Sequence, residues 1–275
     1  MKMRFGDAAV RDKFAYRYRH HVGSDRTPDI VYSCGRDDDG SYFFWSSTTT
    51  WSWPAEPLPM EAIVLLVDAP AMSLLVRSDP GLVSFHAAAV SYGGAAAAIV
   101  GDSTAGKTTT TVACARRGMQ VYSDERLLLD ADAFVLPFLR AFNIRRHGAS
   151  LLHEDAIADE LGAQLAARAG ESDWIDLSPM ESMPHLRLPD PKPLRAIFLL
   201  DGKADRVAIR QVHSARSCPR LLESIDCAAR ARIDRAARVM SLLRSVAVFS
   251  LTLGRPNESA QAIETTLQEL SQDAA

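Results

Sequence analysis

Short apolar runs, separated by polar or glycine-rich turns, characterise the first hundred residues. Runs at 42–45, 51–53, 62–67, 72–76, 82–90 and 95–100 have the length and composition of β-strands. The last two runs are joined by Ser91-Tyr92-Gly93-Gly94, and we expect them to form a hairpin. Residues 1–30 are charged and give no clear prediction. The sequence therefore predicts a β-rich N-terminal extension over residues 1–80.

From residue 95 onward, strand-like runs alternate with helical periodicity. The pattern predicts helices at 108–117, 150–169, 214–243 and 258–272, with strands at 119–123, 126–132, 194–200 and 245–253. Asn257 is the expected N-cap of the last helix. Five prolines at 171–193 predict an irregular connector or covering loop. Alternation of this kind favours an α/β domain over 81–275, a mixed β-sheet flanked by helices, with the extension packed on it.

Composition limits the class of partner. The chain has 275 residues, 47% of them hydrophobic, and a net charge of −3, so no basic field predicts nucleic-acid binding. No apolar run reaches the roughly 18 residues of a membrane span, and no signal-type segment begins the chain. Four scattered cysteines lack metal-ligand spacing and predict free thiols. We expect a cytoplasmic protein; homo-oligomer formation is left open.

The segment from Gly101 to Thr108 carries the strongest chemical signal. It reads Gly-Asp-Ser-Thr-Ala-Gly-Lys-Thr and fits the phosphate-binding pattern G-x-x-x-x-G-K-[ST] between an apolar strand and a helix. Its glycines allow a tight turn whose N–H groups face an anion. Lys107 can reach the outer phosphates of a nucleoside triphosphate, and the Thr108 hydroxyl can hold Mg²⁺. The rest of the predicted binding set comprises Asp102, Ser103, Thr104, Ala105, Gly106 and Thr109. The alternative is a glycine turn that binds nothing.

Three further polar residues are expected near this loop. Asp124 and Glu125 follow the strand after the loop's helix, and ligands of a parallel sheet lie outside such strand ends. Phosphoryl transfer needs a carboxylate for the metal and usually another for the attacking hydroxyl. His86 lies on the strand expected to pair with the one entering the loop. The residues alone also allow a polar turn and a structural histidine.

These residues together resemble a known family. His86-Ala-Ala-Ala-Val, the loop at 101–108, and Arg117-Gly-Met-Gln-Val-Tyr-Ser-Asp124-Glu125 occur in the order seen in the catalytic core of the HPr kinase/phosphorylase superfamily. The resemblance covers about residues 84–146 and is greatest to the shorter related kinases, including those that phosphorylate lasso-peptide precursors. A Pro-Phe-x-Arg segment often follows in those proteins, as Pro137-Phe-Leu-Arg140 does here.

The resemblance implies a P-loop kinase core like the HPr kinase C-terminal domain. It implies an ATP- and Mg²⁺-dependent kinase acting on a hydroxyl, typically a serine, of a peptide or protein. Asp124 would take or orient the hydroxyl proton, and Glu125 with Thr108 would serve Mg²⁺. His86 would help to place Asp124 or a phosphate. Arg140 would clamp the transferring phosphate or the substrate, or else form a surface salt bridge.

Two departures from the family pattern bear on activity. The acidic pair is Asp-Glu rather than Asp-Asp, and the glycine-rich downstream signature of the bifunctional enzymes is missing. We therefore expect no phosphorolysis and do not expect HPr as the acceptor. A small-molecule kinase, for free serine or a sugar, and a nucleotide-dependent ATPase or switch remain as alternatives. A GTPase is not expected, because no N-K-x-D motif is present.

Overall fold

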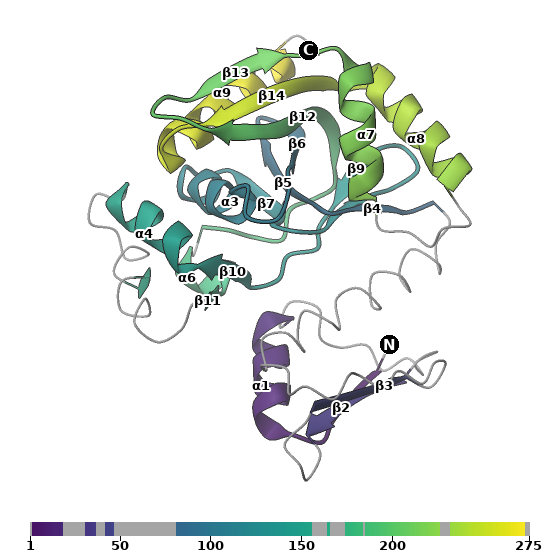
Figure 1. Ribbon diagram of the computed structural model, residues 1–275, viewed down its shortest axis with the longest axis vertical. Helices are drawn as coiled ribbons and strands as arrows, with labels where there is room; N and C mark the ends of the chain where they lie inside the picture. Colours follow the sequence, from purple (N-terminus) through teal and green to yellow (C-terminus); the bar gives the residue numbers. More distant parts are fainter. Residues whose placement is uncertain are drawn as a thin grey trace. The chain divides into compact units, whose positions relative to one another are not determined.

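The chain divides into two compact units, Met1–Ser78 and Asp79–Ala275, close to the boundary predicted at residue 80 (Figure 1). The structure is a computed structural model. It describes residues 2–18, 31–36, 42–46, 81–155, 164–165, 174–183, 185–225 and 232–272. The apolar runs predicted as strands at 51–53, 62–67 and 72–76 lie outside the described residues. The packing of the first unit on the second stays a prediction.

The described part of the first unit combines a small sheet with the helix α1. Its described elements are β1 (Lys2–Phe5), α1 (Ala8–Arg17), β2 (Val31–Arg36) and β3 (Tyr42–Ser46). β2 pairs in parallel with β1 and antiparallel with β3, so the strand predicted at 42–45 is present as β3. The helix α1 was not predicted. It begins at the N-cap Asp7, whose carboxylate accepts a hydrogen bond of 2.9 Å from Val10 N.

The second unit contains a mixed sheet. Its strands are β4 (Val83–Phe85), β5 (Ala87–Tyr92), β6 (Ala95–Val100), β7 (Gln120–Ser123), β8 (Leu127–Leu129), β9 (Phe134–Leu136), β12 (Lys192–Lys203), β13 (Ala208–Gln211) and β14 (Ala247–Leu253). The central order is β7-β5-β6-β12-β14-β13, and β9, β8 and β4 continue from the start of β12. Strands β6, β12 and β14 are parallel, whereas β5 is antiparallel to both β6 and β7.

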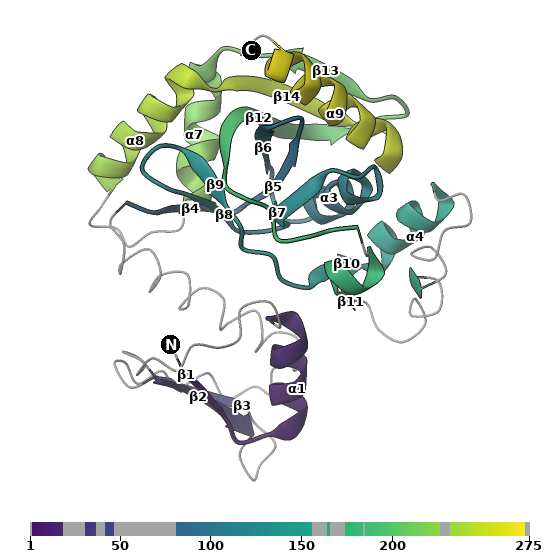
Figure 2. The same cartoon turned by 180° about the vertical axis from the view of Figure 1, so that it is seen from behind.

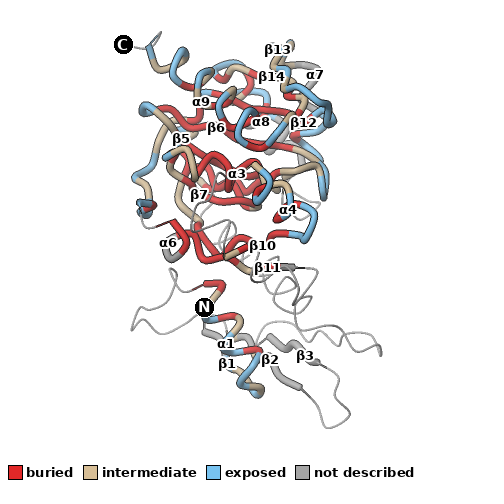
Figure 3. Tube along the Cα trace, turned by 90° about the vertical axis from the view of Figure 1, so that its left-hand side faces the viewer, coloured by how far each residue is buried: buried red, intermediate tan, exposed pale blue. Residues whose placement is uncertain are grey.

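Helices cover both faces of this sheet, which confirms the predicted α/β class (Figures 1 and 2). On one face α3 (Lys107–Arg116) and α9 (Pro256–Gln272) pack on one apolar cluster, and α7 (Ser214–Ser224) with α8 (Arg232–Ser245) contribute to a second. Figure 3 shows that burial is greatest along β5, β6, β7 and α3. Buried alanines line both β5 and β6, and their small side chains let helices approach closely on each side.

A small subdomain follows strand β9, and part of it lies in the segment 171–193 that was predicted to be irregular. Its elements are β10 (Phe142–Arg145), α4 (Arg146–Glu154), β11 (Trp174–Leu177) and α6 (Pro179–Ser182). The irregular connector predicted at 171–193 is wrong in part, because β11 pairs with β10, and β12 begins at Lys192. Prolines do not exclude these elements, since Pro179 occupies the first turn of α6, where no N–H is needed.

Several element boundaries also differ from the prediction. His86 interrupts the predicted strand 82–90, and α4 begins before residue 150 and ends at Glu154; most of 156–169 lies outside the described residues. The predicted helix 214–243 appears as α7 and α8, with 226–231 outside the described residues. The last helix begins at Pro256, so Asn257 is not its N-cap. Its side chain instead accepts a hydrogen bond from Arg117.

No helix in the described part of the chain is both long enough and apolar enough to cross a membrane. Cys114 is buried as a free thiol, and burial raises its pKa well above the usual range. That thiol is accordingly a small apolar packing group rather than a nucleophile.

Two phenylalanines provide a test of the core. Phe198 in β12 is 0% exposed and stacks on Phe249, whereas Phe134 in β9 is 37% exposed. We expect Phe198→Ala to lower the free energy of unfolding by about 3–5 kcal/mol, because it removes a buried ring and leaves a cavity. Phe134→Ala is the matched control and should cost less than about 1 kcal/mol. Urea unfolding followed by circular dichroism measures both; equal losses would contradict the described packing.

Candidate functional site

One edge of the second unit's sheet collects the chemistry predicted from the sequence. Strands β6, β12 and β14 run in the same direction, and β7 joins them because both β6 and β7 are antiparallel to β5. The carboxyl ends of β6, β7, β12 and β14 therefore share an edge with the start of β5. Loops that follow such strand ends are where ligands of open α/β sheets bind.

The loop between β6 and α3 turns tightly at this edge. Thr104 and Gly106 have φ angles of 69° and 114°, and Ala105 N donates a 3.1 Å hydrogen bond to Asp102 O. The φ angle of Gly106 lies in the left-handed region that favours glycine, and a Cβ there would also lie 2.7 Å from Leu253 Cδ1, the end of a side chain on β14. No side chain caps the start of α3. Its first amide groups accordingly lie at the loop, where they can bind an anion.

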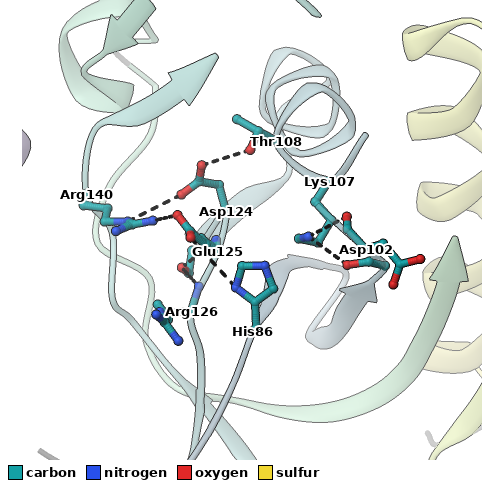
Figure 4. Close-up of polar contacts among 10 residues, drawn as sticks. His86, Asp102, Lys107, Thr108, Asp124, Glu125, Arg126 and Arg140 are labelled. Atoms are coloured by element: carbon teal, nitrogen blue, oxygen red, sulfur yellow. Dashed lines mark hydrogen bonds and ion pairs between the residues drawn. The ribbon is translucent and has the colours of Figure 1, made fainter. Parts of the chain in front are cut away.

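Lys107, the first residue of α3, folds back over the loop. Its Nζ donates to Gly101 O at 2.8 Å and to Asp102 O at 3.1 Å (Figure 4). Burial lowers the pKa of Lys107 from its usual 10.5, and the negative charges of Glu125, Asp124 and Asp102 oppose that shift. An ammonium group held this way can exchange carbonyl oxygens for phosphate oxygens with a small movement.

Thr108 connects the loop to the acidic pair. Its hydroxyl donates a 3.2 Å hydrogen bond to Asp124 Oδ2, and Asp124 is buried. The backbone of the pair is fixed by Ser123, whose Oγ accepts hydrogen bonds from Glu125 N at 3.2 Å and from Arg126 N at 2.8 Å. Figure 4 shows Asp124 pointing toward Thr108 on α3.

Mg²⁺ fits this donor set. A hydroxyl and a carboxylate are the hard oxygen ligands that Mg²⁺ prefers, and the ion usually takes only one or two carboxylates beside phosphate and water. The described residues contain no group of three or more His, Cys, Asp or Glu side chains that could hold a metal by themselves. Thr108 and Asp124 are two oxygen donors that leave the remaining positions around such an ion to phosphate and water.

The Glu125 carboxylate contacts His86 and Arg140. Its Oε1 lies 3.8 Å from His86 Nδ1, its Oε2 contacts the Arg140 guanidinium, and 28% of its side chain is exposed. Arg140 Nε also lies 3.8 Å from Asp124 Oδ1, and the Arg140 side chain is fully buried. His86 lies in the bend between β4 and β5. Its backbone N–H donates a 2.5 Å hydrogen bond to the backbone oxygen of Ser224.

The predicted site residues thus lie in three places. His86, Lys107, Thr108, Asp124, Glu125 and Arg140 lie together, as Figure 4 shows. Asp102, Ser103 and Thr104 lie exposed on the loop. Thr109 lies against the small subdomain, since a Cβ at Gly148 would be 2.6 Å from its Oγ1. Sequence reasoning missed Ser123, although a serine just before an acidic pair is a known signal for a side-chain-stabilised turn.

Comparisons with known proteins give little further guidance. No protein family model matches the sequence, and no curated protein matches it. A search of solved structures finds, among others, the HPr(Ser) kinase/phosphatase from Coxiella burnetii, with 10% sequence identity and a TM-score of 0.32. That match covers 70% of this chain and 97% of the other.

The lowered pKa of Lys107 can be tested by measuring the free energy of unfolding as a function of pH. Between the folded-state pKa and 10.5 the unfolded chain binds more protons than the folded one, so folding gains stability as pH rises through this window. Lys107→Met removes this contribution. We expect the free energy of unfolding of the wild type to increase relative to Lys107→Met as the pH rises towards 10.5. Urea unfolding at several pH values measures the difference; a constant or decreasing difference would contradict the burial of the ammonium group.

Proposed function

We propose that the chain is an ATP- and Mg²⁺-dependent kinase that transfers the γ-phosphate to a serine hydroxyl of a peptide or protein. The observation that carries the proposal is the 3.2 Å contact between the Thr108 hydroxyl and Asp124. It joins a loop suited to polyphosphate with a pair of carboxylates suited to metal and proton chemistry. A loop that only binds nucleotide needs no second carboxylate at this place.

The residues divide the work of binding as follows. Main-chain amides of the loop and of the first turn of α3 bind the phosphates, and Lys107 Nζ moves from the carbonyls of Gly101 and Asp102 onto the outer phosphates. Thr108 and Asp124 would hold Mg²⁺, which would supply charge neutralisation on the phosphate oxygens. The exposed loop residues leave the phosphates accessible from the edge of the sheet.

Glu125 takes the proton in this arrangement. Its carboxylate is the more exposed of the pair and lies beside His86 on the side away from Thr108. The acceptor oxygen forms the new bond to phosphorus, the bond to the leaving ADP oxygen breaks, and the hydroxyl proton passes to Glu125. The sequence-based assignment gave Asp124 the proton and Glu125 the metal. The hydrogen bond from Thr108 to Asp124 supports the reverse.

A pair of variants tests this division of roles. We expect Asp124→Asn to raise the Mg²⁺ concentration needed for half-maximal activity by at least about tenfold. Glu125→Gln should leave that concentration unchanged and lower kcat roughly a hundredfold, since it removes the proton acceptor. Initial rates across a Mg²⁺ titration measure both effects. The opposite pattern, with a Mg²⁺ shift in Glu125→Gln alone, would restore the sequence-based assignment.

Mass spectrometry tests the activity itself. Incubation with Mg²⁺ and ATP should add the mass of one phosphate to a serine peptide, and the resemblance seen in the sequence makes lasso-type precursor peptides the first acceptors to try. Lys107→Ala should lower transfer by at least about a hundredfold, because it removes charge compensation in the transition state. Lys203→Ala, at the exposed end of β12, is the matched control and should transfer normally.

Other outcomes of this experiment identify the alternatives. Phosphate gained only by free serine or a sugar would identify a small-molecule kinase. ATP consumed equally with and without any acceptor would identify an ATPase or switch. Unchanged turnover in Lys107→Ala would contradict every function that uses this loop.

A further inference from the structure

We propose that Arg140 is a positioning residue, which orients the two carboxylates and does not bind the transferring phosphate. The inference rests on the proposed function and assigns Arg140 a role that differs from the phosphate clamp expected from the sequence. It starts from an unusual combination: a guanidinium that is fully buried and still lies within the polar site.

The backbone around Arg140 is fixed before any ligand binds. Phe138 N donates a 2.9 Å hydrogen bond to Tyr122 O in β7, the strand that ends at the acidic pair. Leu139 and Ala141, on either side of Arg140, are both buried. The segment that carries the guanidinium is therefore anchored to the same strand as the carboxylates, and its position relative to them is set by packing.

The guanidinium contacts both acids. Nη2 forms an ion pair with Glu125 Oε2, and Nε lies 3.8 Å from Asp124 Oδ1. A planar guanidinium offers several donors in a fixed geometry, so it can define the directions of two carboxylates at once. A buried cation without such partners would be costly, because it would have lost its hydration with no compensation.

Each carboxylate is thus held between two groups. Asp124 lies between Arg140 and the Thr108 hydroxyl, and Glu125 lies between Arg140 and His86. Removal of the guanidinium would leave two adjacent negative charges that repel each other and turn away from these directions. Catalytic groups tolerate only about 0.5 Å of displacement before the rate falls steeply, so this loss would affect the chemical step.

A direct role on phosphate is hard to reconcile with the same contacts. To reach a phosphate, Arg140 would have to leave Glu125 and Asp124 and emerge from a fully buried position.

Another arginine of the described residues provides a comparison. Arg220 of α7 is 45% exposed, lies 3.8 Å from Asp201 Oδ1, and donates to Leu200 O at the carboxyl end of β12. It has a carboxylate partner at the same edge of the sheet without contact to the acidic pair.

A double-mutant cycle between Arg140 and Glu125 tests the inference. Arg140→Gln alone should lower kcat for ATP turnover about a hundredfold while KM for ATP changes by less than about threefold. In the Glu125→Gln background, the same substitution should cost much less, about threefold, because the proton acceptor that Arg140 orients is already gone and only its approach to Asp124 remains. Arg140→Lys should recover part of the lost kcat. Arg220→Gln, the matched control, should stay within about fivefold of the wild type.

The outcomes separate the two proposals. Equal losses of kcat from Arg140→Gln in both backgrounds would show that Arg140 does not act through Glu125, and a tenfold rise in KM for ATP would show a contact with phosphate. Either result would overturn the positioning role alone. A wild-type protein that does not turn over ATP would overturn the proposed function together with this inference. Should Arg140→Gln fail to fold, as its thermal unfolding would reveal, the Arg140→Lys variant completes the cycle.

Discussion

The hydrogen bond between Thr108 and Asp124 joins the two parts of the site, and it depends on strand direction. Strand β5 lies between β6 and β7 and is antiparallel to both. The loop that follows β6 and the acids that follow β7 consequently meet at one edge, and His86 enters the gap between them from the start of β5. A parallel arrangement of β5 would send His86 to the opposite edge.

The burial of charged side chains costs free energy in this arrangement. Hydrogen bonds and ion pairs made by these side chains offset that cost. Lys107, Asp124 and Arg140 are all buried, which would be strongly unfavourable for each alone. Lys107 is bonded to loop carbonyls, and Arg140 contacts both acids. The buried alanines of β5 and β6 contribute from the apolar side, since their small size lets α3 lie close to the sheet edge.

Local sequence signals predicted the elements around the candidate site well. The loop at 101–108, the helix after it and the strand before Asp124 follow from spacing, glycine positions and apolar periodicity, which act over a few residues. Long-range contacts decide what the sequence did not predict. The pairing of β10 with β11 joins Asn143 to Asp176, which are 33 residues apart in the sequence. The place of Asn257 inside α9 is a different case, because Pro256 begins that helix and is a local signal that the N-cap prediction overlooked. The burial of the Arg140 side chain depends on the packing around Leu139 and Ala141, which no local sequence pattern predicts.

A crystal structure with a non-hydrolysable ATP analogue and Mn²⁺ in place of Mg²⁺ tests the central claim most directly. The account predicts the phosphates at the amide groups of residues 101–108, and an anomalous peak for Mn²⁺ between Thr108 and Asp124. It also predicts Lys107 Nζ on phosphate oxygens instead of the carbonyls of Gly101 and Asp102. Crystals with the analogue bound elsewhere, and with Lys107 still on those two carbonyls, would contradict it.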